Sequence, residues 1–345
     1  MVMDWQLGIG RVERQPFPAY SRAMTPGSFP ILFVTATRIG DAVLSSGLIR
    51  RLAIEIPQAR FTIVAGPVAA PLFKDMPNLE ELILFEKTKD GRHWWRLWQQ
   101  VRRRQWGLVV DLRGSALSRF LKTRRKAVFK RPSGLPVHKV VEAAGVLRVE
   151  ASEAPPYLYT SEETEAGALG IIQGEGPILA LAPAANWVGK TWPVERFAQV
   201  AIQLMSEGGP FHGGRLMVLG GPDDIHMVQS LRHVVSKDRF IDLVGKVDLL
   251  TAHAALRHVR LFIGNDSGLM HLAAAAEIPT LGLFGPSDEA LYAPWGDQTR
   301  VVRGPRSFEQ IRATDPEFQQ ALCHMMDLPL ETVLVAAREL LAATE

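Results

Sequence analysis

The sequence predicts an α/β protein with two doubly wound, Rossmann-like domains that face each other across a cleft. Three observations support this prediction. Short apolar runs alternate with amphipathic segments along most of the chain, as in parallel sheets covered by helices. The length of 345 residues suits two domains of ordinary size. Between Arg148 and Thr160, the sequence RVEASEAPPYLYT has the Pro-Pro pair and small residues of an interdomain linker.

This linker divides the chain into an irregular lead-in over residues 1–29, an N-terminal domain over 30–155 and a C-terminal domain over 156–345. In the first domain we expect a helix at 42–55 and strands at 31–35, 60–65, 82–85, 108–112 and 127–130. In the second we expect strands at 178–181, 216–219, 240–244, 261–263 and 279–284, with helices at 194–206, 224–235, 249–259 and 330–343. The first domain lacks the Gly-x-Gly-x-x-Gly spacing, so we expect no nicotinamide or flavin cofactor.

Composition indicates a folded cytoplasmic protein. Hydrophobic residues make up 47% of the chain and charged residues 22%, and no apolar run is long enough to span a bilayer. The N-terminus carries an acid at Asp4 and no apolar segment before a cleavage site, so we expect no secretory signal. The single cysteine, Cys323, excludes an internal disulfide framework and a cysteine-rich metal cluster.

Basic residues are concentrated in one segment of the first domain. The net charge is only +3, yet residues 92–139, the basic block, hold fourteen Lys and Arg against a single acid, Asp111. Four tryptophans are interleaved with them: Trp94, Trp95, Trp98 and Trp106. Nucleic acid, an anionic membrane surface or a phosphorylated glycolipid would be attracted to such a face, and a solvated basic face is the alternative.

The stretch from Val259 to Ser287 predicts a strand, a polar turn, an alanine-rich helix and a second strand. Asp266 or Ser267 can cap the helix, and Gly268 lets a ligand approach the amides of its first turn. Such a helix start suits a diphosphate. The same pattern also fits a plain βαβ unit with a capped helix.

Two further loops of the second domain carry polar residues where strands end. Lys190, in GKTWP, would offer a mobile positive charge to a phosphate, or is an exposed loop lysine. In LGGPDD, Asp223 could accept a hydrogen bond from a base or ribose hydroxyl while Asp224 caps the next helix, and capping alone would explain both acids.

The corresponding loop of the first domain is Arg38-Ile39-Gly40-Asp41. Asp41 could N-cap a helix that starts at Ala42, which the spacing alone favours. At the edge of a cleft it could instead remove a proton from an acceptor hydroxyl as a general base. No Asp-x-Asp pair, which often holds a metal ion on a sugar diphosphate, occurs in the chain.

Five segments occur in order along the chain: RIGDAVLSSGLIRRL from residue 38, DLRG at 111–114, GKTWPVERFA at 189–198, LGGPDD at 219–224 and NDSGLMHLAAAAEIPTLGLFGPSD at 265–288. Together they resemble glycosyltransferase family 9, the heptosyltransferases of lipopolysaccharide core assembly. The resemblance implies a GT-B fold and metal-independent transfer with inversion. It also implies that ADP-heptose is bound mainly by the C-terminal domain, that the acceptor is bound by the N-terminal domain, and that no cofactor is needed.

Motif positions then assign roles. The resemblance makes Asp41 the base and places Lys190 on the donor phosphate and Asp223 on the nucleoside. Further donor-site residues are Asn186, Asp266, Ser267, Gly268 and His271. Some family members have two threonines where this chain has Ala185 and Asn186, so the phosphate contacts differ here, and His271 could also be structural. The acceptor side is assigned Arg38, Asp111, Arg113, Arg119, Lys122, Arg124 and Arg125.

The resulting hypothesis is an enzyme that moves heptose from ADP-heptose to an anionic, lipid-linked saccharide of the lipopolysaccharide inner core. It would be cytoplasmic and peripheral at the inner face of the inner membrane, with no nucleic acid as partner. A sugar-nucleotide epimerase on the same fold is the alternative enzyme. A noncatalytic nucleic-acid-binding protein that uses the basic block, with its Trp and Arg residues, is the alternative from another class.

Overall fold

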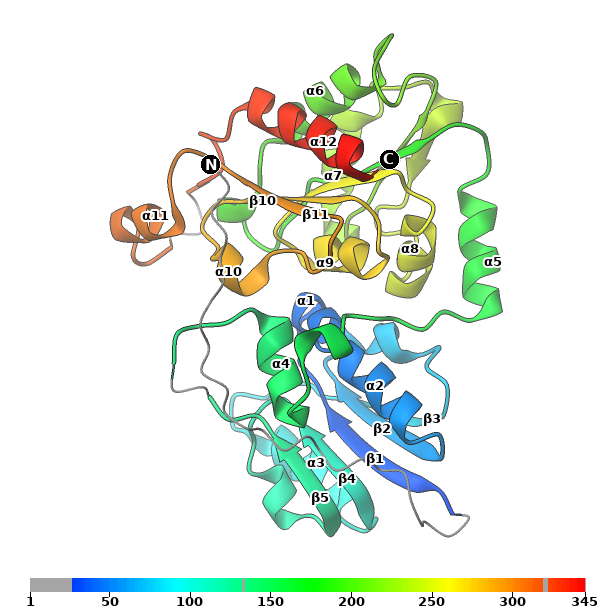
Figure 1. Cartoon of the computed structure of the whole chain (residues 1–345), viewed down its shortest axis with the longest axis vertical. Helices are drawn as coiled ribbons and strands as arrows, with labels where there is room; N and C mark the ends of the chain where they lie inside the picture. Colours follow the sequence, from blue (N-terminus) through cyan, green and yellow to red (C-terminus); the bar gives the residue numbers. More distant parts are fainter. Residues whose placement is uncertain (1–26, 132–133, 319–321, 345) are drawn as a thin grey trace.

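The computed structural model describes residues 27–131, 134–318 and 322–344. It contains two parallel β-sheets, one in each half of the chain, with helices packed around both (Figure 1). The prediction of two doubly wound domains is confirmed. The predicted irregular lead-in at residues 1–29 lies outside the described residues up to residue 26, and the first strand already begins at Phe29.

The first sheet has five strands in the order β3-β2-β1-β4-β5, all parallel. Their bounds are β1 (Phe29–Val34), β2 (Ala59–Ala65), β3 (Leu79–Leu84), β4 (Trp106–Asp111) and β5 (Thr123–Val128). The central strands are buried along their length, which explains their near-continuous apolar sequences.

The second sheet has six parallel strands in the order β11-β10-β9-β6-β7-β8. Their bounds are β6 (Ile178–Ala182), β7 (Arg215–Val218), β8 (Phe240–Asp242), β9 (Leu261–Asn265), β10 (Thr280–Phe284) and β11 (Thr299–Arg303). The edge strand β11 is absent from the predicted strands, because its residues TRVVR mix charged and apolar side chains.

Helices connect the strands. In the first half they are α1 (Ile39–Leu44), α2 (Gly47–Glu55), α3 (Arg92–Val101) and α4 (Lys139–Leu147). In the second half they are α5 (Glu162–Ile171), α6 (Val194–Met205), α7 (Ile225–Leu231), α8 (Leu249–Leu256), α9 (Gly268–Ala275), α10 (Glu289–Tyr292), α11 (Phe308–Thr314) and α12 (Leu330–Thr344). Among the described residues, no helix combines the length and apolar character needed to cross a bilayer.

The single helix expected at 42–55 is wrong in one respect, because the chain forms two helices there. Ser45 and Ser46 separate α1 from α2, and both hydroxyls donate to carbonyls of the preceding turn, at 2.9 Å to Asp41 O and 2.7 Å to Val43 O. Such local hydrogen bonds compete with the regular helix pattern. Gly47 then allows α2 to start directly against the backbone of the linker at Ala154 and Pro155.

In each sheet the strand order reverses once, between β1 and β4 in the first and between β6 and β9 in the second. Doubly wound sheets bind ligands at such points, outside the carboxyl ends of the strands. The segments that follow these four strand ends carry Asp41 in α1, Leu112, Lys190 and Asp266. The fold therefore places three residues of the predicted site, Asp41, Lys190 and Asp266, next to the two switch points, where the strand order reverses.

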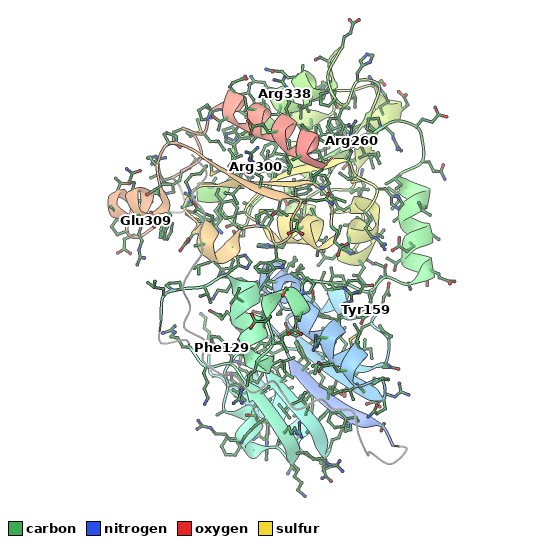
Figure 2. The ribbon with its side chains drawn as sticks, viewed as in Figure 1. Phe129, Tyr159, Arg260, Arg300, Glu309 and Arg338 are labelled. Carbon is green, nitrogen blue, oxygen red and sulfur yellow. The ribbon has the colours of Figure 1, made fainter. Side chains whose placement is uncertain are left out.

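The two switch points meet where α1 packs against α9. Two glycines allow this close approach. A Cβ atom on Gly40 would lie 2.8 Å from Cδ2 of His271, and a Cβ atom on Gly268 would lie 2.8 Å from side-chain atoms of Ile39. The domains also meet where Nε2 of His138, just before α4, donates to Ala293 O at 2.9 Å. The chain passes from one domain to the other near Tyr159 (Figure 2).

Candidate active site at the domain interface

Asp41 is the third residue of α1, and Arg38 occupies the N-cap position. The hypothesis that Asp41 N-caps a helix starting at Ala42 is therefore wrong. Its carboxylate accepts no hydrogen bond from any described residue, and the Arg38 side chain makes no capping bond. Asp41 is held in place by the backbone of α1, which leaves its carboxylate available to a ligand.

The Asp41 side chain lines a pocket of about 220 Å³ between the domains. One wall is α4, with Lys139 and Glu142, whose side chains form an ion pair at 2.9 Å. Phe129, which follows β5, closes the pocket on the sheet side. Tyr292 of α10 comes from the second domain, so the pocket is complete only when the two domains are together.

Burial is the largest influence on the Asp41 carboxyl and raises its pKa above the ordinary value. The positive charges of Arg38 and Lys139 act in the opposite direction, and the negative charges of Glu142 and Asp266 raise the pKa further. A carboxylate with a raised pKa is a stronger proton acceptor. Desolvation together with named charge partners at a cleft is typical of functional acids.

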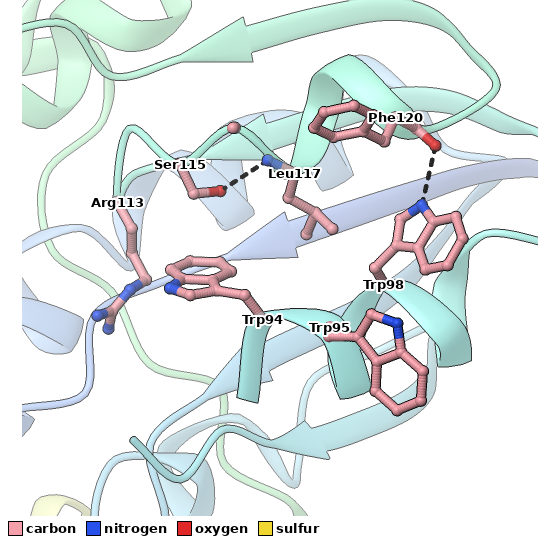
Figure 3. Close-up of a pocket in the computed structure, with 8 residues that line it drawn as sticks. Trp94, Trp95, Trp98, Arg113, Ser115, Leu117 and Phe120 are labelled. Atoms are coloured by element: carbon pink, nitrogen blue, oxygen red, sulfur yellow. Dashed lines mark hydrogen bonds between the residues drawn. The ribbon is translucent and has the colours of Figure 1, made fainter. Parts of the chain in front are cut away.

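Asp111 and Arg113 belong to the turn that follows β4. The Asp111 carboxylate is fully buried and accepts from the amides of Arg113 and Ser115, both at 2.9 Å, and from the Ser115 hydroxyl at 2.5 Å. It shapes the turn and does not face solvent. The Arg113 guanidinium lies over the rings of Phe85 and Trp94, at one side of an aromatic pocket (Figure 3).

The remaining predicted acceptor residues are exposed. Arg38 lies beside Asp41 at the start of α1. Arg119 lies in η2 (Leu117–Phe120), Lys122 follows it, and Arg124 and Arg125 lie on the edge strand β5. The structure thus places this group along one edge of the first domain. It places only Arg38 next to the pocket of Asp41.

On the opposite domain, Lys190 and Asp266 form an ion pair, with Nζ 2.5 Å from Oδ2. The Asp266 side chain is nearly buried, whereas that of Lys190 is partly exposed. Lys190 comes from η4 (Val188–Lys190) and Asp266 from the turn between β9 and α9. Since these elements follow neighbouring strands, the ammonium group is held at the switch point.

A buried asparagine fixes the loop that carries Lys190. Nδ2 of Asn265 donates to Pro183 O at 2.6 Å, and its Oδ1 accepts from the Trp192 amide at 3.2 Å. These two contacts join the end of β9 to both ends of the loop between β6 and α6. The position of Lys190 therefore depends on Asn265, the last residue of β9.

Three buried polar atoms near these strand ends have no hydrogen-bond partner among the described residues: Ser267 Oγ, His271 Nδ1 and Ser287 Oγ. Buried polar groups are usually hydrogen-bonded, so each of these unpaired atoms indicates a position where a ligand or a water molecule can bind. Burial lowers the pKa of His271 to about 4, so the imidazole is neutral at pH 7. A neutral ring can either donate or accept at Nδ1.

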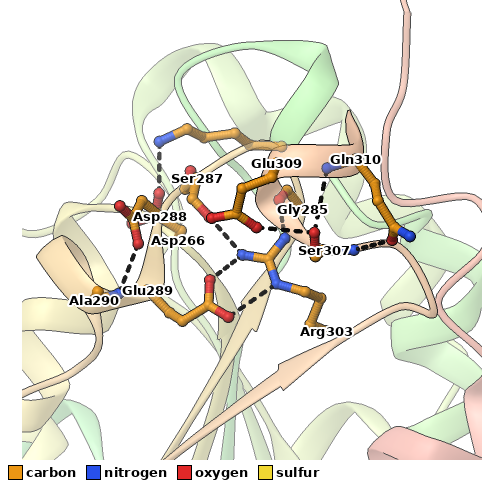
Figure 4. A network of polar contacts seen from close by, with 11 residues as sticks. Asp266, Gly285, Ser287, Asp288, Glu289, Ala290, Arg303, Ser307, Glu309 and Gln310 are labelled. Carbon is orange, nitrogen blue, oxygen red and sulfur yellow. Dashed lines mark hydrogen bonds and ion pairs between the residues drawn. The ribbon is translucent and has the colours of Figure 1, made fainter. Parts of the chain in front are cut away.

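The loop that carries Ser287 is held by Arg303 of β11 (Figure 4). The guanidinium donates to the carbonyls of Gly285 and Ser287 and pairs with the Glu289 carboxylate in a two-point contact. Bidentate contacts of this kind fix geometry strongly. Arg303 thereby fixes the loop that follows β10.

Asp223 and Asn186 are exposed and lie on loops of the same domain. Asp223 is in η5 (Pro222–Asp224), directly after β7, where a ligand could reach its carboxylate. Asp224 occupies the N-cap position of α7, as expected, but its side chain makes no capping bond to that helix, because its Oδ2 accepts from the Gly221 amide at 2.7 Å. Asp224 instead fixes the glycine pair at the strand end.

Sequence reasoning missed five residues of this site: Lys139, Glu142, Asn265, Ser287 and Tyr292. Asn265 and Ser287 stand inside the motif quoted for the family, so their place at strand ends was a usable signal. The other three lie in segments without a motif, and only the packing of α4 and α10 brings them to Asp41. Within the described ranges, no three His, Cys, Asp or Glu side chains are grouped so as to hold a metal ion.

Comparison with known proteins supports a family assignment. Residues 135–319 match the family model described as "Glycosyltransferase family 9 (heptosyltransferase)". The lipopolysaccharide heptosyltransferase 2 of Salmonella typhimurium is 24% identical over 353 residues, which cover 90% of this chain and 98% of that protein. The lipooligosaccharide heptosyltransferase 2 of Haemophilus influenzae is 25% identical, with coverage of 90% and 99%.

Solved structures share the fold. The ADP-heptose lps heptosyltransferase II of E. coli aligns with a TM-score of 0.70 at 22% identity, covering 92% of this chain and 99% of its own. The glycosyl transferase family 9 structure from Veillonella parvula aligns with a TM-score of 0.73 at 22% identity and coverage of 93% and 100%. The E. coli heptosyltransferase WaaC with ADP gives 0.61 at 17% identity, with coverage of 84% and 100%. These matches confirm the GT-B fold predicted from the sequence.

Proposed function

The chain belongs to glycosyltransferase family 9, and on that premise we propose that it transfers heptose from ADP-heptose to an inner-core acceptor of lipopolysaccharide. We further propose that transfer inverts the anomeric carbon and needs neither a metal ion nor a cofactor. The relatives named as lipopolysaccharide and lipooligosaccharide heptosyltransferases support the transferred sugar and the acceptor class, and the E. coli structure named for ADP-heptose supports the donor.

One observation carries this proposal. A desolvated carboxylate without a hydrogen-bond partner, Asp41, faces a pocket shared by both domains, and Lys190 with the start of α9 lies on the other side of the α1–α9 contact. The first group suits an acceptor hydroxyl and the second suits a diphosphate. Donor and acceptor would therefore meet between the domains.

In the proposed reaction, the Asp41 carboxylate takes the proton of the acceptor hydroxyl as that oxygen attacks the anomeric carbon of the heptose. The bond between this carbon and the diphosphate oxygen breaks, and the electron pair leaves with ADP. Attack from the face opposite the nucleotide inverts the configuration. Lys190 and the free amides at the start of α9 stabilise the charge that develops on the diphosphate.

The donor would bind mainly to the second domain. Its diphosphate would lie near Lys190, Ser267 and Gly268, and His271 Nδ1 and Ser287 Oγ supply buried polar atoms that lack other partners. Asp223, in η5, would accept from the nucleoside, and Asn186 lies on the loop that leads to Lys190. Asp266 acts by holding Lys190 at 2.5 Å.

The acceptor would be anionic and lipid-linked, and the enzyme would work as a peripheral protein at the cytoplasmic face of the inner membrane. The exposed positive charges of Arg119, Lys122, Arg124 and Arg125 support this part. They would attract an anionic surface by long-range electrostatics, which salt screens over about 8 Å at physiological ionic strength. No nucleic acid is expected to bind.

The test is transfer itself. Purified protein, ADP-heptose and a truncated inner-core acceptor should release ADP and yield a product whose new glycosidic bond is inverted relative to the donor, as read by NMR. Activity should persist in EDTA. Release of an altered sugar nucleotide in the absence of acceptor would instead identify an epimerase and refute the proposal.

A further inference from the structure

A second hollow lies on the first domain, away from Asp41. It has a volume of about 690 Å³ and lies between α3 and the segment 113–120, including η2 (Figure 3). Aromatic and apolar side chains line most of it, and they are Trp94, Trp95, Trp98, Leu117 and Phe120, with Arg113 on one side. We call it the tryptophan pocket. Its size is that of a site for a small ligand.

Packing explains why the hollow is stable in shape. Leu97 and Val101 on the inner side of α3 are buried in the core, which fixes the helix on the sheet. Trp98 Nε1 donates to Phe120 O at 3.1 Å and so ties α3 to η2 across the pocket. The pocket therefore has walls held by a hydrogen bond and by core contacts.

The mouth of the pocket is apolar and exposed. Trp95 is 57% exposed and Phe120 is 69% exposed, although both are large aromatic residues. By contrast, Trp106 of the same segment is fully buried, and Trp94 and Trp98 pack partly against the core. Exposed apolar surface around a hollow is typical of an interaction site. Tryptophan is also the residue that membrane interfaces favour.

Three exposed positive charges come from the segment that holds Phe120 and the residues directly after it. Arg119 is next to Phe120 in the chain, and Lys122 and Arg124 follow, all exposed. Within the described part of the chain, none of these three forms an ion pair, and Arg102 stacks over the Trp98 ring. Unpaired cations beside an apolar pocket complement a ligand with an anionic head and a hydrocarbon chain.

The tryptophan pocket is connected to the active site through one turn. Leu112 lines the pocket of Asp41, and the next residue, Arg113, lines the tryptophan pocket. Both follow β4, whose carboxyl end is at the switch point. A lipid held in the tryptophan pocket would keep the cleft close to a membrane surface.

We propose that the tryptophan pocket binds an acyl chain of an anionic membrane lipid while Arg119, Lys122 and Arg124 contact its phosphate group. This inference deepens the proposed function, because it names the site through which the enzyme would attach to the membrane. It differs from adsorption by charge alone, since it requires a chain to enter the pocket. The occupant is a membrane lipid and not the saccharide acceptor.

The experiment measures binding of the full-length protein to vesicles of phosphatidylglycerol and phosphatidylcholine by cosedimentation at several salt concentrations. The wild-type protein should bind the anionic vesicles and bind vesicles of pure phosphatidylcholine only weakly. Replacing Arg119, Lys122 and Arg124 by Gln should lower the partition coefficient on the order of 100-fold, because each such charge contributes a factor of about five. The matched control removes Lys237, Arg312 and Arg338, three exposed cations of the other domain, and should bind like wild type.

The apolar part is tested separately. Trp95→Ala should weaken binding roughly tenfold with all charges intact, because about half of a tryptophan surface loses its lipid contact. Ile202→Ala, at an equally exposed apolar position on the second domain, is the control. Ala116→Phe is the decisive variant: it adds apolar surface at the mouth but fills the pocket, so binding should fall several-fold.

Two results would overturn the proposal. If Ala116→Phe binds vesicles as well as or better than wild type, no chain enters the pocket and the aromatic rim acts only as surface. If Trp95→Ala has no effect while the triple charge variant does, attachment is electrostatic only. Transfer to a soluble acceptor without acyl chains separates this inference from the proposed function, since Trp95→Ala and Ala116→Phe should retain it at the wild-type rate. Absence of transfer in wild type itself would refute the proposed function and leave the vesicle results standing.

Discussion

Replacing Asp41 by Asn removes the proposed base with the least possible change in shape. The carboxylate accepts no hydrogen bond among the described residues, so the amide breaks no contact. An amide cannot take a proton from the acceptor hydroxyl. General-base catalysis typically contributes about 10² to 10⁴-fold, so kcat should fall by that factor, or about 3 to 5 kcal/mol in activation free energy.

The stability of the protein should not fall in Asp41→Asn, although its kcat does. Because burial raises the pKa of Asp41, the folded state holds its proton more tightly than the unfolded state does. The free energy of unfolding therefore decreases as pH rises through the window between the ordinary pKa and the raised pKa. Asp41→Asn removes this cost, so its melting temperature at pH 7 should equal or exceed that of wild type.

The assay follows ADP release at saturating donor and acceptor, and calorimetry measures ADP binding. ADP affinity should stay at the wild-type level, because the donor contacts come from the other domain. Glu142→Gln is the matched control, since it removes a carboxylate of the same pocket that is already paired with Lys139. A near wild-type rate in Asp41→Asn, or a larger loss in Glu142→Gln, would refute the assignment of the base.

Three further predictions concern the second domain and its contact with the first. Lys190→Gln should weaken ADP binding in calorimetry and lower the melting temperature, because it leaves buried Asp266 unpaired; adding Asp266→Asn should restore stability but not affinity. Gly40→Ala should lower kcat and weaken ADP binding, since its Cβ would lie 2.8 Å from His271 of the donor site, whereas Gly145→Ala, which meets nothing within 4 Å, should be neutral in the same assays. Asn265→Ala should lower the free energy of unfolding, measured with denaturant, by about 2 to 4 kcal/mol, because two buried partners lose their hydrogen bonds. A decrease below about 1 kcal/mol would contradict the role of Asn265 in fixing the Lys190 loop.

The sequence was sufficient for the parts of the fold that depend on local pattern. Buried parallel strands such as β4 and β9 are apolar runs that end at polar turns, so their type and order could be predicted. The break at Ser45 and Ser46 could not, because it depends on two side-chain hydrogen bonds inside an otherwise helical pattern. Edge strand β11 was missed because exposure to solvent removes the apolar signal.

For the site as well, local sequence pattern predicted some residues, while contacts between distant segments determined the others. Lys190 and Asp266 stand next to strand ends, so sequence alone placed them at a crevice, although nothing in it showed that they pair. Spacing favours Asp41 as a cap and the family resemblance implies a base, and the helix start at Ile39 decides against the cap. Tyr292 could not be predicted, because it reaches the pocket of Asp41 from the other domain.

The charges of the site suggest how donor binding prepares the base. Asp266 already raises the pKa of Asp41 from across the interface, and its charge is compensated by Lys190. A bound diphosphate would bring additional negative charge to the same end of α9 and would compete with Asp266 for Lys190. Both effects raise the pKa of Asp41 further, because like charges disfavour the ionised form. The pKa read from the acid limb of the kcat–pH profile at saturating donor should therefore be higher than the pKa of Asp41 measured by NMR in the ligand-free protein. Equal pKa values would show that the donor charge does not affect the base.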